Sequence, residues 1–149
     1  MSAPRKISRA DIVLSARRWL GTPYQHQASL IQVGCDCLGL VRGVWREVIG
    51  PEPEAVPPYS ADWAEAGGRE DLLDAGLRHL KPRNKTAWCP GDVLLFRWRT
   101  HVPAKHLAIV SASDMMIHAH DGASVAEVAL SRFWLRHLDH VFAFPGVDD

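Results

Sequence analysis

The chain has 149 residues, of which 47% are hydrophobic, a length and composition typical of one globular domain with a buried core. Seventeen basic and seventeen acidic residues cancel, so no overall field favours direct nucleic-acid binding or attachment to an anionic membrane. The N-terminal residues lack an apolar stretch of secretory length, and we expect neither a signal peptide nor membrane insertion. We therefore expect one domain, residues 1–149, that recognises its partners through local contacts.

The N-terminal third has the apolar spacing of two helices. Residues 8–20 repeat apolar side chains at helical intervals, with Ser8 as a candidate N-cap. Residues 21–34 have turn residues and no period, which indicates a loop. A second helix follows, which is indicated by a broad apolar stripe. Asp36 is a good N-cap for it, and Gly50 begins a Gly-Pro stop. Cys37 is therefore predicted in the first turn of this second helix.

The C-terminal part changes from helical to strand patterning. Four prolines exclude regular structure in residues 51–60, and residues 62–80 predict one or two helices. After Gly91 the chain has short apolar runs separated by turn residues, as in an antiparallel meander. The predicted strands are residues 93–98, 107–110, 115–119, 125–130 and 141–144. Helices followed by strands predict an α+β domain, with N-terminal helices packed on a C-terminal antiparallel β-sheet.

The three cysteines, Cys35, Cys37 and Cys89, cannot all pair with one another, so at least one thiol is free. Cys37 is the candidate nucleophile, because backbone N–H groups at a helix start favour a thiolate and offer donors to an oxyanion. The alternative is that Cys37 is a small buried hydrophobic residue, which is how most free cysteines behave. For Cys35 and Cys89 we expect this buried, unreactive role.

A thiol nucleophile needs a base, and eight histidines are available. His106 begins one predicted strand and His118 lies in the next, so neighbouring antiparallel strands place both rings close together. His120 is two residues after His118 and points to the same face of a strand, so the pattern alone does not separate these two. Zinc is the competing chemistry, but a single residue between Cys35 and Cys37 is not the usual ligand spacing. We expect no metal and no cofactor.

Several stretches, in order along the chain, resemble the NlpC/P60 family of cell-wall peptidases. They are Gly21-Thr-Pro-Tyr24, Asp36-Cys-Leu-Gly-Leu-Val41, Pro90-Gly-Asp-Val-Leu-Leu-Phe96, Lys105-His-Leu-Ala-Ile-Val110 and Met116-Ile-His-Ala119. The resemblance implies the papain-like NlpC/P60 fold and a cysteine peptidase that hydrolyses peptidoglycan. Motif and predicted context agree at Cys37, which favours the catalytic interpretation over the buried one.

The resemblance also implies a role for each matching residue. Cys37 is then the nucleophile, His106 the general base and acid, and His118 the residue that orients His106. Tyr24 is placed beside the thiol, near the oxyanion or the scissile group, although simple packing under the loop explains an aromatic residue there equally well. Asp36 either caps the helix or meets a substrate amine.

Two positions depart from the family pattern, and one of them, Ala108, stands where glycine is common. Leu38 follows the nucleophile, where many members have a serine associated with the free amino end of the substrate. The substrate specificity of those members is therefore in question for this chain.

Two further stretches, Pro103-Ala-Lys-His106 and Phe142-Ala-Phe-Pro145, are similar to phage-type peptidases encoded with tail genes, including those of gene transfer agents. This similarity implies a protein made in the cytoplasm, assembled with phage-tail-like hub or tip proteins, and carried to the periplasmic cell wall. It would cut stem peptides there during DNA delivery. The alternatives are a structural tail-tip protein with a weak or unused site, and a protease of tail assembly.

Overall fold

The computed structural model of the chain describes residues 6–54, 69–120 and 122–148. The N-terminal elements are β1 (Ile7–Ser8), α1 (Arg9–Arg17), β2 (Ser29–Leu30), β3 (Gly34–Cys35), α2 (Cys37–Val48) and α4 (Asp71–His79). They are followed by β4 (Lys81–Arg83), β5 (Val93–Phe96), β6 (His106–Ala112), β7 (Met115–His118), β8 (Ala126–Ala129), α5 (Arg132–His137), β9 (Leu138–Ala143) and β10 (Val147–Asp148). The α+β class predicted from the sequence is confirmed.

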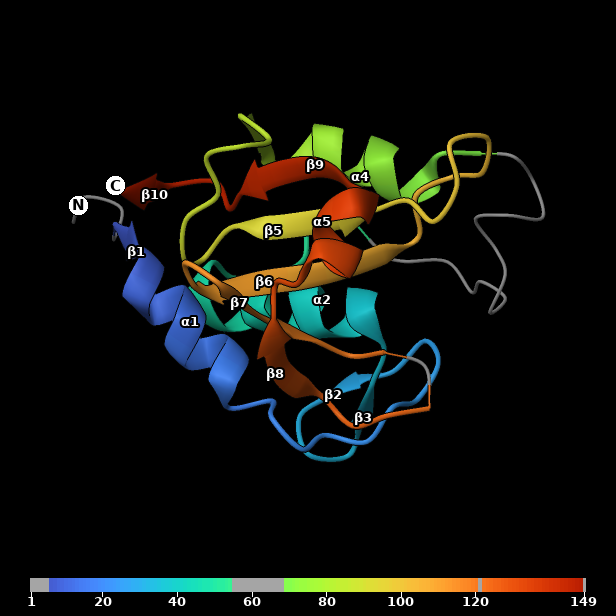
Figure 1. Cartoon of the computed structure of the whole chain (residues 1–149). Coiled ribbons are helices and arrows are strands. Elements are labelled where there is room, and N and C mark those ends of the chain that lie inside the picture. The colour runs from blue at the N-terminus through green and yellow to red at the C-terminus, as the bar shows by residue number, and fades with distance from the viewer. Residues whose placement is uncertain (1–5, 55–68, 121, 149) are drawn as a thin grey trace.

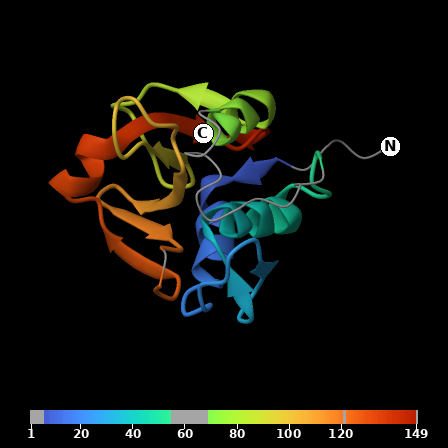
Figure 2. The same cartoon turned by 90° about the vertical axis from the view of Figure 1, so that its right-hand side faces the viewer.

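A six-stranded antiparallel sheet, in the order β4-β9-β5-β6-β7-β8, forms the centre of the molecule. Alternate residues of β6 enter two different cores. Leu107 and Ile109 join the larger core, which also holds buried side chains of α1, α2 and α4. Ala108 and Val110 join a smaller core, against which Trp134 of α5 packs. Three helices therefore cover one face of the sheet and α5 covers part of the other (Figures 1 and 2).

Helix α1 begins where the sequence predicts and ends earlier. The Ser8 hydroxyl accepts a hydrogen bond from the backbone N–H of Asp11 at 3.0 Å, which caps the helix. Tight turns replace the helix after Arg17, so the predicted end at residue 20 is three residues too late. The Trp19 ring lies so close to α2 that a Cβ at Gly43 would be 2.0 Å from it. This contact fixes α1 against α2.

The loop predicted for residues 21–34 is present with one addition, the short hairpin of β2 and β3 that ends at Cys35. The backbone N–H of Cys35 donates to Pro23 O at 3.1 Å, and that of Gln25 donates to Cys35 O at 3.0 Å. The backbone N–H of Gly21 also donates a hydrogen bond to Val125 O at 2.9 Å. The loop is thereby held between the start of α2 and the start of β8.

Two regions differ from what the sequence predicts, since no element is predicted for residues 131–140 and one or two helices are predicted for residues 62–80. Residues 131–140 lack a readable period, because α5 has only six residues and leaves none buried, yet they form α5 and the first half of β9. The predicted helical region 62–80 is confirmed only as α4, since residues 55–68 lie outside the described part of the chain. No described helix has the length and apolarity needed to cross a bilayer.

Candidate active site

Cys37 is the first residue of α2, as the sequence predicts. Asp36 is extended and its Oδ1 accepts a hydrogen bond from the backbone N–H of Gly39 at 2.7 Å. This is the capping arrangement expected of an aspartate before a helix. The thiol therefore leaves the helix at its positive end, next to backbone N–H groups that have no partner within the helix.

The loop before α2 is clamped to the first turn of the helix. Asp36 Oδ2 accepts from the backbone N–H of Gln27 at 2.7 Å, and Asp36 N–H donates to Ala28 O at 3.3 Å. A Cβ added to Gly39 would lie only 1.9 Å from Ala28 O, so this approach requires glycine. The Ser29 hydroxyl donates to Gly39 O at 2.6 Å. The position of Cys37 is thus determined from both the helix and the loop.

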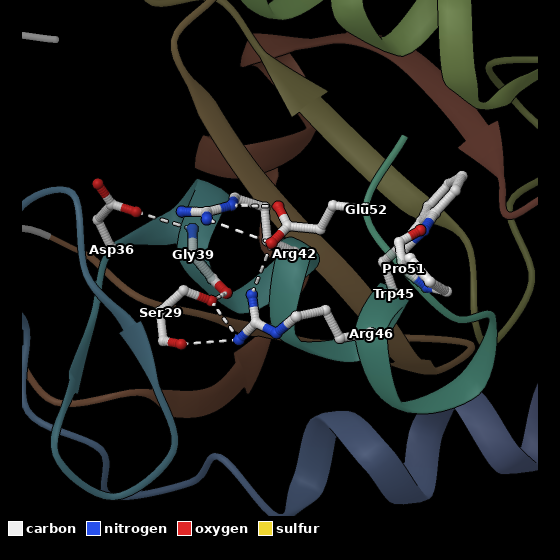
Figure 3. A network of polar contacts seen from close by, with 8 residues as sticks. All are labelled: Ser29, Asp36, Gly39, Arg42, Trp45, Arg46, Pro51 and Glu52. Atoms are coloured by element: carbon white, nitrogen blue, oxygen red, sulfur yellow. Dashed lines mark hydrogen bonds and ion pairs between the residues drawn. The ribbon is translucent and has the colours of Figure 1, made fainter. Parts of the chain in front are cut away.

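A second set of contacts holds the same loop against the outer side of α2 (Figure 3). Arg46 donates to Ser29 O at 2.7 Å and to Ser29 Oγ at 2.9 Å. Arg46 and Arg42 both bind the carboxylate of Glu52, at 3.1 Å and 2.6 Å. One helix face therefore anchors both the hairpin before it and the segment after it.

The Cys37 thiol lies against the backbone on both sides of His106. Its Sγ is 3.9 Å from the carbonyl oxygen of Lys105, and the backbone N–H of Leu107 is also a hydrogen-bond partner. The pairing of β6 with β7 begins at Ile109. The backbone of β6 before Ile109 is therefore not paired with β7 and can contact the thiol. Within the described residues, no hydrogen bond joins the thiol to an imidazole ring.

His106 and His118 are brought together. Nε2 of His106 is 2.8 Å from Nδ1 of His118, and both side chains are buried. His120 shares their face of the sheet, with its ring centre 5.3 Å from that of His106, but it is exposed. The ring hydrogen bond therefore distinguishes His118 from His120, which the sequence pattern leaves undecided.

Burial disfavours the charged forms of Cys37, His106 and His118. It lowers the pKa of His106 well below its ordinary value, and together with the charge of His120 it lowers the pKa of His118 to about 4. Burial, followed by the Asp36 carboxylate, raises the pKa of the Cys37 thiol to about 12. Backbone N–H groups at the start of the helix lower this pKa, as predicted, but burial and the Asp36 carboxylate outweigh them in this state.

Tyr24 lies beside Cys35, the residue two positions before the candidate nucleophile. Tyr24 forms an isolated parallel bridge with Cys35, and its side chain packs on the larger core. Cys35 is fully buried in that core, which raises the pKa of its thiol to about 12. The buried, structural interpretation of Cys35 is confirmed. Cys89 is half-buried, and its Sγ accepts a hydrogen bond from Arg83 Nη2 at 3.4 Å.

Aromatic side chains around His106 are a feature that the sequence analysis missed. The rings of Trp98 and Trp134 stack on the His106 ring with centroid distances of 5.8 Å and 5.6 Å. Trp98 follows Leu94 and Phe96 at alternate positions, so strand periodicity already places it on the face of His106. Trp134 carries no comparable signal, because α5 is too short to show a period.

Arg97 is a second feature that the sequence analysis does not predict. Its guanidinium binds the Asp139 carboxylate at 3.0 Å and 3.1 Å, Glu70 Oε2 at 2.5 Å and Val102 O at 2.7 Å. Glu70 Oε1 also accepts from the backbone N–H of Ala104 at 3.1 Å. Arg97 thereby holds the segment that leads into His106.

These residues define an α+β domain with a cysteine at a helix start beside a hydrogen-bonded histidine pair. No group of three potential metal ligands is found among the described residues. The model of the NlpC/P60 family matches residues 21–143. The chain belongs to the NlpC/P60 family, whose members are cysteine peptidases and related hydrolases that act on peptidoglycan.

Solved structures show the same fold. An NlpC/P60 family protein from Bacillus cereus is 17% identical, with a TM-score of 0.69 over 94% of this chain and 41% of its own length. The NlpC/p60 domain of the peptidoglycan hydrolase SagA is 23% identical, with a TM-score of 0.60 over 91% of this chain and 98% of that domain. Ly7917 with the hydrolysing product of MDP is 12% identical, with a TM-score of 0.57 over 92% of this chain and 63% of its length. No curated protein sequence matches the chain.

Proposed function

We propose that the protein is a cysteine endopeptidase that hydrolyses peptidoglycan stem peptides. The observation that carries the proposal is the Cys37 thiol at the start of α2, held against the backbone on both sides of His106. Nε2 of His106 is engaged with His118, which leaves Nδ1 to exchange a proton with the thiol. The hydrogen bond between a catalytic thiol and its base is often long in a free enzyme and shortens when substrate binds.

The proposed reaction is acyl transfer. His106 takes the proton of Cys37, and the sulfur attacks the scissile carbonyl carbon to form a tetrahedral oxyanion that faces the backbone N–H of Cys37. Collapse of the oxyanion breaks the C–N bond, and the imidazolium of His106 gives its proton to the leaving amine. Water then adds to the thioester with His106 as base, releasing the carboxylate and restoring the thiol.

The uncharged resting site supports a particular role for His118. Moving the proton from Cys37 to His106 creates two charges in a buried site, which costs free energy unless the imidazolium is stabilised. When Nδ1 of His106 takes the thiol proton, Nε2–H of His106 donates to Nδ1 of His118, 2.8 Å away, which orients the His106 ring and stabilises its charged form. Tyr24 is proposed to contact the oxyanion or the scissile group. Asp36 acts as the cap of the catalytic helix.

The proposed bond is the one between γ-D-glutamate and the diamino acid of the stem, cut while a phage-like tail delivers DNA across the wall. The stretches 103–106 and 142–145, which resemble tail-encoded peptidases, support this delivery route. A structural tail-tip role predicts that particles carrying Cys37→Ala deliver DNA normally. A role in tail assembly predicts an uncut tail protein in the same particles.

Purified protein, incubated with a defined stem tetrapeptide, tests the activity. Mass analysis of the products should find two fragments whose masses add up to the tetrapeptide plus one water. Cys37→Ala should give neither fragment and should keep the circular dichroism of the wild type, whereas Cys89→Ala should retain activity because that thiol contacts Arg83 away from the histidines. Product formation by Cys37→Ala would refute the proposal.

A further inference from the structure

His26 is a half-buried histidine on the loop before α2, and the proposed acyl transfer does not use it. The backbone N–H of Ala28 donates to Gln25 O at 3.1 Å, which closes a turn with His26 and Gln27 at its centre. Gln27 has a φ of 67°, in the left-handed region that residues with a side chain rarely adopt. Such a conformation costs free energy and persists only where its surroundings hold it. The turn therefore holds His26 in a fixed place on the loop.

The His26 ring lies next to the carboxylate that caps α2. Its Nδ1 is 3.8 Å from Asp36 Oδ2, the same oxygen that accepts the Gln27 N–H at 2.7 Å. The other oxygen, Oδ1, accepts from the Gly39 N–H at 2.7 Å (Figure 3). The Asp36 side chain is 5% exposed and that of His26 is 31% exposed. Asp36 is thus a nearly buried carboxylate, and His26 is a partly exposed ionisable group in contact with it.

The charge of Asp36 acts directly on the candidate nucleophile. Burial is the larger cause of the raised pKa of Cys37, and the Asp36 carboxylate is the second cause. A negative charge next to a thiol disfavours the thiolate by electrostatic repulsion. Any positive charge that approaches Asp36 therefore makes the Cys37 thiolate easier to form.

His26 supplies a positive charge that depends on pH. The other ionisable side chains around the turn and the thiol are Tyr24, Cys35 of β3, Arg42 and Arg46 of α2 with their partner Glu52, and Lys105 and His106 where β6 begins. Arginine keeps its charge at every working pH, and burial lowers the pKa of His106 well below its ordinary value. Histidine ordinarily changes charge between about pH 5 and 8, so protonation of His26 places a cation beside Asp36 in mild acid.

We propose that His26 is a positioning residue of the candidate active site, whose imidazolium pairs with Asp36 and offsets the negative charge that Asp36 places beside the Cys37 thiol. The inference rests on the proposed function for the role of Cys37, and adds a residue that acts on the nucleophile through the helix cap. When His26 is charged, the thiolate forms at a lower cost. When His26 is neutral, Asp36 opposes thiolate formation in full.

The expected effect is modest because the pair is partly solvated. His26 is nearly one-third exposed, and water screens its charge at that depth. A buried ion pair at the same distance would change the thiolate fraction by far more than tenfold. We expect the charge of His26 to raise the thiolate fraction of Cys37 about threefold.

Modification of Cys37 by dithiodipyridine, which reacts with thiols in mild acid, measures this effect. Cys89→Ala is the parent protein, because Cys35 is fully buried and Cys37 is then the accessible thiol. The rate constant of the parent, divided by that of His26→Gln, should be about three at about pH 5.5 and fall to about one at about pH 8.5. The pH dependence of the reagent cancels in this ratio.

Two further variants separate charge from structure. His26→Lys should keep the higher rate across the same range, because its ammonium group stays charged. His101→Gln, which changes an exposed histidine between β5 and β6, should match the parent at every pH. In an Asp36→Asn background, His26→Gln should leave the rate unchanged, because the charge to be offset is gone.

A ratio for His26→Gln that does not vary with pH would overturn the inference, since loosening of the loop changes the rate equally at every pH. An effect of His26→Gln that is as large in the Asp36→Asn background would also overturn it, because His26 would then not act through the cap. Failure of the proposed function is distinguishable from both results, since the stem peptide would remain uncut while the pH-dependent ratio persisted.

Discussion

Replacing Gly39 by alanine tests whether the loop before α2 holds the candidate nucleophile in place. The new Cβ would lie 1.9 Å from Ala28 O, a backbone atom, so the loop must move away by more than an ångström. That movement breaks the hydrogen bonds that Gln27 and Ser29 make to the helix start, at 2.7 Å and 2.6 Å. Their loss costs about 3–4 kcal/mol, since one of them is made to a carboxylate, and better helix propensity returns about 1 kcal/mol.

The expected result is a net loss of about 2–3 kcal/mol in the free energy of unfolding, measured by urea denaturation. Alkylation of Cys37 by iodoacetamide, followed by peptide mass mapping, should also accelerate because the thiol loses its fixed environment. Gly76→Ala is the comparison variant, because its Cβ would meet a side chain, the tip of the buried Phe142 ring at 2.9 Å, and not the backbone of the loop before α2. A Gly39→Ala protein within about 0.5 kcal/mol of the wild type would refute the clamp.

Three further changes examine charges and contacts around the site. Asp36→Asn keeps a helix cap but removes a negative charge, so the pKa of Cys37 should fall and its alkylation near pH 8 should quicken; an unchanged pH profile would contradict the role of Asp36. Because the folded-state pKa of His118 is lowered to about 4, its contribution to stability should be fully present at neutral pH and should fall by roughly 3 kcal/mol as the pH drops from 6.5 towards 4, in addition to the loss from His106. Urea unfolding of His118→Gln should show a flatter pH dependence; if it is as steep as that of the wild type, His118 is not the source. Arg97→Ala frees the segment before His106 and should lower kcat about tenfold to a hundredfold, with Arg97→Lys intermediate; equal kcat values would show that the ion pairs do not position His106.

The sequence predicts the elements around the thiol well because their signals are local. Asp36 has the residue type and position of an N-cap, and the following apolar stripe has helical period, so α2 is predicted almost to the residue. The strand carrying His106 is predicted for a similar reason, since its apolar run is buried on both faces and is bounded by turns. Local capping and periodicity act within a few residues and are visible without the fold.

Features that depend on distant partners are not predictable in this way. The raised pKa of Cys37 follows from burial under the completed fold, whereas the helix start alone predicts a lowered value. Arg97 carries no local signal of its partners, because Glu70, at the N-cap of α4, and Asp139, in β9, are 27 and 42 residues away. Trp134 reaches His106 from a helix too short to show a period. Each of these depends on contacts formed only when the sheet is complete.

Trapping of the acyl-enzyme tests the central claim most directly. The protein is mixed with the defined stem tetrapeptide, quenched in acid within one turnover, and digested for mass mapping. The account predicts an added acyl group, with the mass of the N-terminal fragment less one water, on the peptide that contains Cys37. Cleavage without any adduct on Cys37, at a rate that Cys37→Ala leaves unchanged, would contradict it.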